Sequence, residues 1–260
     1  MVYRPLSPSE WHARFTQQTR WTQDLRRYLY ERVSLPEAQR VLEVGCGTGA
    51  ALSDEAFRRG RGVFGLDINP HHLALAKRNA PRAALILGDA HQLPFPPATF
   101  DLTFCHFLLL WVAEPLRVVS EMRRVTQPGG AVLALAEPDY GGRIDYPPEL
   151  EILGRWQTES LRRQGADPLI GRKLAGIFRA AGLQGVESGV LGGQWRGASL
   201  AEEQDAEWRI LQHDLEYLAS DATVQATTIE DLRQRERIAC QRCERITFVP
   251  TFYAWGRVEP

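Results

Sequence analysis

The chain has 260 residues, of which 44% are hydrophobic, and a formal net charge of −1 at pH 7. This length and apolar content suit one large domain or one domain with an insertion. The nearly neutral charge gives no bulk attraction to nucleic acid or a membrane, and no run of about 18 apolar residues would span a bilayer. The first residues are polar and aromatic, so we expect no signal peptide and a cytoplasmic protein.

The first half of the chain predicts a helix followed by alternating strands and helices. Residues 9–34 carry apolar side chains at three- and four-residue intervals, which is typical of an amphipathic helix. Asn69 fits the N-cap of the helix expected over 69–80, with Pro70 in its first turn. The expected strands are 40–45, 62–68, 83–89, 100–107 and 131–138, and the expected helices are 49–60, 69–80 and 115–126. This alternation indicates crossover units and a mostly parallel sheet with both faces covered.

The second half has a different pattern, with more helix and fewer strands. Pro250 and Gly256 in the last strand favour an edge position or a bulge over a central position. The expected helices are 147–165, 171–183, 199–220 and 228–243, and the expected strands are 184–193 and 247–258.

The four cysteines give no metal site. Cys240 and Cys243 form a single C-x-x-C pair, and a zinc site needs a second pair of ligands. We therefore expect reduced structural thiols and predict no bound metal.

The stretch VLEVGCGTGA, residues 41–50, ends an expected strand with three glycines at alternate positions. Such a loop turns sharply and lets a ligand approach the backbone. The string Gly45-x-Gly47-x-x-Ala50 fits the dinucleotide fingerprint, and Asp67 follows at about the distance of the ribose-binding acid. A nicotinamide-dependent oxidoreductase is therefore one interpretation.

Three features favour a different ligand. Glu43 lies two residues before the first glycine, where a carboxylate would repel a pyrophosphate and attract an ammonium group. Asp89 ends the third strand, where its side chain can accept a hydrogen bond from an exocyclic amine. The fourth strand, FDLTFCHFLLLWV, is followed by a helix and by RRVTQPGGAVLAL, a fixed pattern that dehydrogenases do not have.

Together these motifs resemble the class I S-adenosylmethionine-dependent methyltransferases, in particular the methyltransferase type 11 or ubiquinone-biosynthesis-like branch. The resemblance is close over 38–138, weaker over the N-terminal helix and 171–183, and fades over 195–243. It implies a Rossmann-like sheet of seven mostly parallel strands, the last antiparallel, flanked by helices. We expect one domain over 1–260, with a helical cap at 1–34, a cofactor-binding core at 36–138 and a helical insertion at 195–243 that completes a lid.

The resemblance also implies roles for individual residues. Glu43 would help hold the ammonium end of the cofactor, and Asp67 would take both ribose hydroxyls. Ile68 would flank the adenine ring, while Asp89 and Ala90 would read its edge. The full set of expected cofactor contacts is Glu43, Gly45, Cys46, Gly47, Gly49, Asp67, Ile68, Asp89, Ala90 and Cys105, with Gln18, Trp21 and Thr22 from the N-terminal helix.

Methyl transfer needs a nucleophile aligned with the S–CH₃ bond, and a general base only where the acceptor carries a proton. His106 is the candidate base, although a positioning or packing role fits it as well. His12 could also reach the site. The candidate substrate contacts are Phe107, Glu137, Asp139 and Tyr140, because ligands of open parallel sheets bind beyond the carboxyl ends of the strands.

The fourth strand ends in CHFL and lacks the Asn/Asp-Pro-Pro-aromatic string of amino-methylating nucleic-acid enzymes. We therefore predict transfer to a small organic acceptor, with neither nucleic acid nor a membrane as partner. Two alternatives remain at this point. One is a non-catalytic protein of the same fold that binds S-adenosylmethionine or S-adenosylhomocysteine, and the other is an NAD(P)-dependent oxidoreductase.

Overall fold

The computed structural model describes residues 5–54, 57, 62–191, 201–219 and 226–260. It divides the chain into two compact units. The larger unit comprises Ser7–Pro138, Ile170–Leu191 and Thr251–Pro260, and the smaller unit comprises Met1–Leu6, Asp139–Leu169 and Gly192–Pro250. The insertion expected at 195–243 belongs to the smaller unit together with 139–169, although 195–200 and 220–225 lie outside the described residues.

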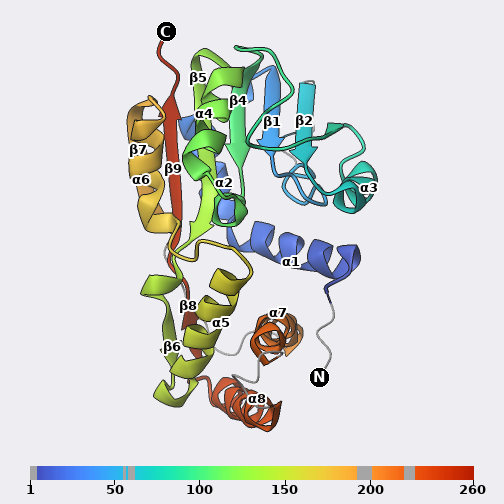
Figure 1. Cartoon of the computed structure of the whole chain (residues 1–260), viewed down its shortest axis with the longest axis vertical. Helices are drawn as coiled ribbons and strands as arrows, with labels where there is room; N and C mark the ends of the chain where they lie inside the picture. Colours follow the sequence, from blue (N-terminus) through green and yellow to red (C-terminus); the bar gives the residue numbers. More distant parts are fainter. Residues whose placement is uncertain (1–4, 55–56, 58–61, 192–200, 220–225) are drawn as a thin grey trace. The chain divides into compact units, whose positions relative to one another are not determined.

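The larger unit is built on a sheet with the strand order β3-β2-β1-β4-β5-β9-β7 (Figure 1). Strands β1 to β5 run parallel, and β9 is antiparallel to both β5 and β7. The predicted sheet of seven strands with an antiparallel last strand is thus confirmed. The strands are β1 (Arg40–Val44), β2 (Gly62–Asp67), β3 (Ala84–Leu87), β4 (Phe100–Cys105), β5 (Thr126–Pro138), β7 (Gln184–Leu191) and β9 (Thr251–Arg257).

Helices cover both faces of this sheet because the side chains of each strand alternate between two cores. In β1, Leu42 and Val44 enter the core under α4 (Pro115–Val125) and α6 (Leu174–Ala180), whereas Val41 enters the core under α2 (Gln23–Arg32). Two more helices, α1 (Pro8–Trp21) and α3 (Pro70–Asn79), contact each other. As expected, the Asn69 side chain caps α3 by accepting from the backbone N–H of His71 and of His72.

The helix expected over 9–34 is two helices that break at Thr22. The Thr22 hydroxyl donates to the carbonyl of Gln18 at 2.9 Å. Such back-bonding of a β-branched side chain bends helices. The helix α1 begins at a capping box in which Ser7 and Glu10 satisfy each other's backbone N–H.

The helix expected over 49–60 is wrong for its first half. Residues 47–54 form turns and bends, whereas 55–56 and 58–61 lie outside the described residues. Several hydrogen bonds here span three residues, including those from Asp54 to Ala51 and from Phe57 to Asp54. Ala51 and Leu52 are buried in the α2 core, so this packing holds the segment in a tighter path than an α-helix.

The last expected strand, 247–258, is divided at Pro250 into β8 (Ile246–Phe248) and β9. The expected edge position is wrong, because β9 lies between β5 and β7. The expected bulge is present on the neighbouring strand: the register of β7 shifts between Gln184 and Glu187, opposite Gly256. Pro250 falls between the two strands, where its missing N–H costs no ladder bond.

The smaller unit combines helices with a two-stranded antiparallel sheet of β6 (Ile144–Tyr146) and β8, a strand pair that the sequence did not predict. Its helices are α5 (Glu151–Arg163), α7 (Ala201–Ala219) and α8 (Ala226–Gln241). Leu153, Trp208, Leu215 and Ile229 contribute to its hydrophobic core. The short 3-10 helices of the two units are Leu35–Glu37, Leu109–Trp111, Tyr140–Gly142, Pro148–Leu150 and Gly171–Lys173.

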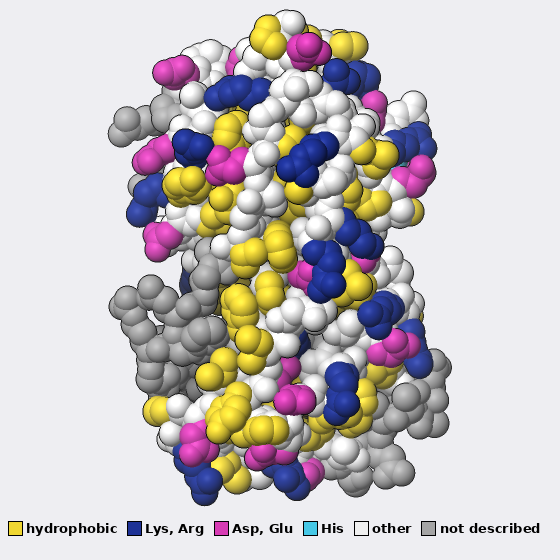
Figure 2. Space-filling view, turned by 90° about the vertical axis from the view of Figure 1, so that its left-hand side faces the viewer, with side chains coloured by type: hydrophobic (Ala, Val, Ile, Leu, Met, Phe, Trp, Pro, Cys, Tyr) yellow, Lys and Arg dark blue, Asp and Glu magenta, His cyan; other side chains and the backbone are white. Residues whose placement is uncertain are grey.

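The surface carries both signs of charge. On the face shown in Figure 2, basic and acidic side chains are interspersed with apolar ones. None of the helices in the described part of the chain has the length and apolarity needed to cross a membrane.

Candidate active site

The carboxyl ends of β1 to β4 lie side by side at one edge of the sheet. Val44 at the end of β1 pairs with Leu66 of β2 and with Cys105 of β4, and Asp67 pairs with Leu87 of β3. The loops that follow these four strands therefore emerge together. Most of the expected cofactor contacts lie in or beside these loops.

The glycine loop has a backbone that other residues would strain. Gly45, Gly47 and Gly49 have φ values of +73°, +51° and +78°. Side chains are also excluded by packing: a Cβ on Gly47 would lie 2.9 Å from the ring of Phe15. The loop thus presents its backbone rather than side chains, as a ligand-binding turn requires.

Asp67 fixes this loop. One of its carboxylate oxygens accepts from the Gly47 N–H at 2.7 Å, and the other accepts from the Asn69 N–H at 2.8 Å. Each oxygen can accept a further hydrogen bond, so the carboxylate can still bind two hydroxyl groups. The next side chain, Ile68, is 70% exposed and offers apolar surface to a planar ring.

Glu43 is a buried side chain whose carboxylate lacks a hydrogen-bond partner on one oxygen among the described residues. Its side chain is 2% exposed, and Oε2 has no hydrogen-bond partner among the described residues. Burial raises the pKa of Glu43 to about 8; the charge of Arg26 opposes this shift and that of Asp67 adds to it. Because an unpaired buried carboxylate is costly, a cationic ligand group here would supply the missing partner.

The helix α1 is attached to the glycine loop by the expected approach of His12 and by contacts that the sequence did not reveal. His12 Nδ1 lies 2.8 Å from the Thr48 hydroxyl, and the Asn79 amide donates to the Thr48 carbonyl at 2.9 Å. The ring of Phe15 packs against Gly47 and edge-on to His72, with 5.7 Å between ring centroids. An aromatic residue on an amphipathic helix gives no sequence signal of such a contact.

The other residues of α1 that were expected to contact the cofactor differ in exposure. The Gln18 side chain is half-buried. The indole of Trp21 is 45% exposed, and the guanidinium of Arg14 lies over it at 4.7 Å from the ring centroid. Stacking of this kind is weak at exposed sites. Because almost half of its surface is exposed, Trp21 remains accessible to a ligand.

Thr22 connects the N-terminal helices to the end of β4. Its hydroxyl lies 3.0 Å from His106 Nε2 and accepts from Arg26 Nη1 at 2.8 Å. Burial lowers the pKa of His106 to about 3, with a further contribution from the charge of Arg26. His106 is therefore neutral at pH 7, and so low a pKa favours positioning over general-base catalysis.

Glu137 organises the loop after β4. Its Oε1 accepts from the N–H groups of Leu108 and Leu109, both at 2.9 Å, and its Oε2 accepts from the N–H of Leu110 at 3.2 Å. The side chain is fully buried, which raises its pKa to about 7 against the opposing effect of the three N–H donors. The carboxylate of Glu137 is thus directed at the backbone.

The cysteines and the neighbouring aromatic residue complete this edge. Cys105 is fully buried with Sγ 4.0 Å from Glu137 Oε1, and Cys46 is 4% exposed. Burial raises the pKa of both thiols. Phe107 has a left-handed backbone, with φ +54°, and packs edge-on to His106. All four cysteines of the chain are free thiols.

At the end of β3, the carboxylate of Asp89 is 54% exposed. Its Oδ1 accepts from the His91 N–H at 2.9 Å and lies 2.7 Å from His91 Nδ1, contacts that lower the pKa of Asp89. The side chain of Ala90 packs in the core, so only its backbone can meet a ligand.

Asp139 and Tyr140 belong to the smaller unit. Asp139 is buried and accepts from the Gly141 N–H at 3.0 Å, and Tyr140 lines a pocket of that unit. Within the described residues, no group of three or more His, Cys, Asp or Glu side chains is placed to hold a metal ion.

Comparison with known proteins gives a consistent family. A family model described as "Methyltransferase domain" matches residues 42–134. A demethylmenaquinone methyltransferase of Geobacillus stearothermophilus is 31% identical over 194 residues, which are 66% of this chain and 81% of that protein. An uncharacterized 37.1 kDa protein in transposon TN4556 of Streptomyces fradiae is 35% identical over 151 residues, which are 55% of this chain but only 42% of that protein.

Two solved structures share the fold at low sequence identity. Phosphoethanolamine N-methyltransferase 2 of Haemonchus contortus, in complex with S-adenosyl-L-methionine, has a TM-score of 0.54 and 18% identity, covering 85% of this chain and 49% of that one. The [4+2]-cyclase SpnF has a TM-score of 0.52 and 22% identity, covering 92% of this chain and 81% of that one. Both likenesses concern the fold alone.

Proposed function

The chain belongs to the class I S-adenosylmethionine-dependent methyltransferases of the ubiquinone- and menaquinone-like branch, and we propose that it methylates a small organic acceptor at the strand-end site of the larger unit. It is an enzyme, and its cofactor is S-adenosylmethionine. The match to a methyltransferase domain gives no support to the oxidoreductase alternative.

The observation that carries the site assignment is the buried carboxylate oxygen of Glu43, which has no hydrogen-bond partner in the part of the chain that the structure describes. Nicotinamide dinucleotides would place a negative pyrophosphate at the glycine loop, and the ionised form of Glu43 would repel it. The methionine part of S-adenosylmethionine carries an ammonium group, which satisfies a carboxylate. The residues present therefore fit this cofactor better than a dinucleotide.

We assign the remaining contacts in the same way. Asp67 would bind the ribose hydroxyls through the acceptor capacity left on its two oxygens. Ile68 would pack against the adenine ring, and Asp89 with the backbone of Ala90 would bind its edge. The glycine backbone at 45–49 would lie along the methionine part. These residues bind and orient the cofactor, which supplies an electrophilic methyl group when bound.

The acceptor side needs few chemical groups from the protein. Aligning the nucleophile and excluding water supply most of the rate enhancement in such a transfer. His106 is neutral and hydrogen-bonded to Thr22, so we assign it a positioning role beside the methyl group. Glu137 would act through the 108–110 loop, whose backbone N–H groups it binds.

The relatives' names set the range of acceptors. The demethylmenaquinone methyltransferase is named for a quinone acceptor, and a relative in Serratia marcescens is named malonyl-[acyl-carrier protein] O-methyltransferase. We propose an acceptor of this kind, an organic molecule rather than a nucleic acid.

Calorimetric titration of the purified protein tests the proposal. We expect micromolar binding of S-adenosylmethionine and S-adenosylhomocysteine and none of NADH. The isosteric variant Glu43→Gln should weaken binding of both sulfur compounds. Binding of NADH alone would overturn the assignment, and cofactor binding without turnover on a broad acceptor panel would favour a non-catalytic role.

A further inference from the structure

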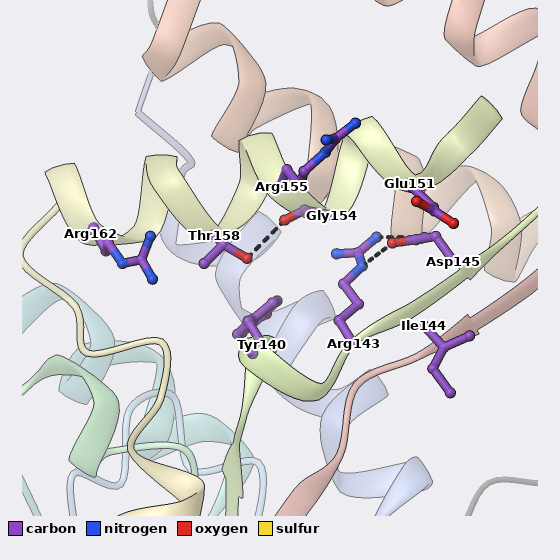
Figure 3. Close-up of a pocket in the computed structure, with 10 residues that line it drawn as sticks. Tyr140, Arg143, Ile144, Asp145, Glu151, Gly154, Arg155, Thr158 and Arg162 are labelled. Carbon is purple, nitrogen blue, oxygen red and sulfur yellow. Dashed lines mark hydrogen bonds and ion pairs between the residues drawn. The ribbon is translucent and has the colours of Figure 1, made fainter. Parts of the chain in front are cut away.

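The smaller unit contains a pocket of about 610 Å³ between α5 and the segment 140–145 (Figure 3). This volume is in the range of small-molecule sites. The α5 residues that line it are spaced by three and four positions, so one face of the helix forms a wall. They are Glu151, Gly154, Arg155, Thr158 and Arg162.

A buried ion pair between Arg143 and Asp145 lines the pocket. Arg143 donates from Nε to Asp145 at 2.6 Å and from Nη2 to the other carboxylate oxygen at 3.0 Å, and the two side chains are 6% and 3% exposed. The Oδ1 of Asp145 that accepts from Arg143 Nη2 also accepts from Arg245 at 2.7 Å. A Cβ on Gly154 would lie 2.5 Å from Asp145 Oδ2, so the glycine allows the pair to approach the helix.

Arg143 retains unused hydrogen-bonding capacity in this buried position. Its guanidinium has five N–H donors. Two bind Asp145 and a third binds the Gln157 amide oxygen. Two N–H groups are thus left without a protein acceptor among the described residues, beside a cavity large enough for a ligand.

Two further arginines of the wall lack a close carboxylate within the part of the chain that the structure describes. Arg155 makes no ion pair there, not even with Glu151 one turn away, and Arg162 is 3.8 Å from a carboxylate oxygen of Glu159. Glu159 is itself bound more closely by Arg163, at 3.1 Å. Arg162 extends from α5 to the side on which Tyr140 and Thr158 lie (Figure 3).

The pocket therefore has surplus positive charge and N–H donors. Of its two acidic residues, Asp145 is neutralised by two arginines. We propose that this pocket binds the anionic group of an organic molecule, a carboxylate or a phosphate ester, through Arg143 and Arg162. Both groups match the planar, bidentate donor geometry of arginine.

The proposed anion site is distinct from the cofactor site, because every residue that lines the pocket belongs to the smaller unit. None of the assigned cofactor contacts lies in the smaller unit. The family model ends at residue 134, before the pocket begins. Anion binding can therefore differ here between members of one family while cofactor binding stays the same.

Titration of the full-length protein with phenyl phosphate and benzoate, with benzyl alcohol as a neutral probe, tests the proposal. We expect the two anions to bind at millimolar concentration or below, and more weakly as salt is added. The variant Arg162→Gln should bind them at least about tenfold more weakly, through loss of charge-assisted hydrogen bonds. The tighter of the two anions identifies the group as carboxylate or phosphate.

Arg179→Gln is the matched control, an exposed arginine on α6 of the larger unit that should leave anion binding unchanged. Each variant is also titrated with S-adenosylhomocysteine, whose affinity should stay the same. Failure of both anions to bind, equal binding of benzyl alcohol, or unchanged anion binding by the Arg162 variant would overturn the pocket assignment. Anion binding without cofactor binding would instead overturn the proposed function and leave the pocket standing.

Discussion

The two units use buried charge in opposite ways. In the larger unit, Glu43 is buried with one oxygen unpartnered among the described residues. In the smaller unit, the buried charges satisfy one another: Asp145 binds Arg143 and Arg245, and Arg245 also binds Glu236 at 3.1 Å. A carboxylate left incomplete marks a site that a ligand completes, whereas the closed network around the Asp145 carboxylate holds its two arginines in place.

The first test of this comparison removes the centre of the closed network. Asp145→Ala leaves two buried guanidinium groups without their carboxylate, so we expect a loss of about 3–5 kcal/mol of unfolding free energy. Hydrogen exchange of the α5 amides, combined with denaturant unfolding, measures it. Asp231→Ala is the control, because Asp231 pairs with Arg235 in the same unit while 60% exposed; we expect at most about 1 kcal/mol. Equal losses of unfolding free energy in the two variants would mean that the buried network stabilises the unit no more than an exposed ion pair does.

The second test removes a carboxylate of the larger unit whose oxygens both accept hydrogen bonds from the protein backbone. Glu137→Ala leaves three backbone N–H groups of the 108–110 loop without their acceptor, and we expect a loss of about 2–4 kcal/mol. Glu137→Gln keeps one acceptor oxygen and should cost less. Thermal and denaturant unfolding check both variants. If turnover fell while stability stayed at the wild-type value, Glu137 would belong with the ligand-binding groups instead.

The third test concerns Asp67, whose carboxylate fixes the glycine loop and would also bind the cofactor. Asp67→Ala should weaken S-adenosylhomocysteine binding by about 1–3 kcal/mol, by loss of hydrogen bonds to the ribose and of the bond that fixes Gly47. Isothermal calorimetry measures the change. Asp24→Ala removes a carboxylate that is 94% exposed and should have no effect. Unchanged affinity in the Asp67 variant would mean that the site is misplaced.

The smallest expected effect is a proton released from Glu43. The raised pKa of about 8 means that the cofactor-free protein holds a proton on Glu43 at pH 7, whereas an ammonium group beside it favours the ionised form. Binding of S-adenosylhomocysteine should therefore release up to one proton. Its affinity should rise between pH 7 and 8 by less than about tenfold.

Calorimetry in buffers of different ionisation enthalpy counts this proton, and Glu43→Gln should abolish the release. Among the groups around Glu43, His106 is already neutral, and Cys46, Cys105 and Tyr30 have raised pKa values. The same shift bears on stability. The pKa of Glu43 is raised in the folded state. The stability that Glu43 contributes is therefore fully present below its ordinary pKa of 4.5 and is lost as the pH rises through about 8. Release of no proton would mean that Glu43 is already ionised or lies outside the site.

The sheet and the cofactor loops could be predicted because their signals are local. Gly45, Gly47 and Asp67 stand at fixed spacings after apolar runs, and the structure places them at neighbouring strand ends. Arg26 was missed as a partner of Thr22 because a charged residue on a helix is usually exposed, whereas here it is 5% exposed.

The polar network of the smaller unit could not have been predicted. Asp145 and Arg245 are 100 positions apart, and no periodicity connects them. Strands β6 and β8 have only three residues each, which is too short for an alternating pattern. The central position of β9 was missed because Pro250 and Gly256 are usually signs of a sheet edge, and pairing over long distances leaves no trace in a single sequence.

The position of β9 has a consequence for how the protein is made. This strand, Thr251–Arg257, leaves the ribosome after the other six strands of its sheet, yet it separates β5 from β7 and is the strand neighbour of β7 in the sheet. Until it is synthesised, β5 has an open edge and β7 has no strand to pair with. Chains that terminate before residue 251 would expose these edges, which can pair with other chains and aggregate. Completion of the larger unit therefore has to wait until the whole smaller unit has been synthesised.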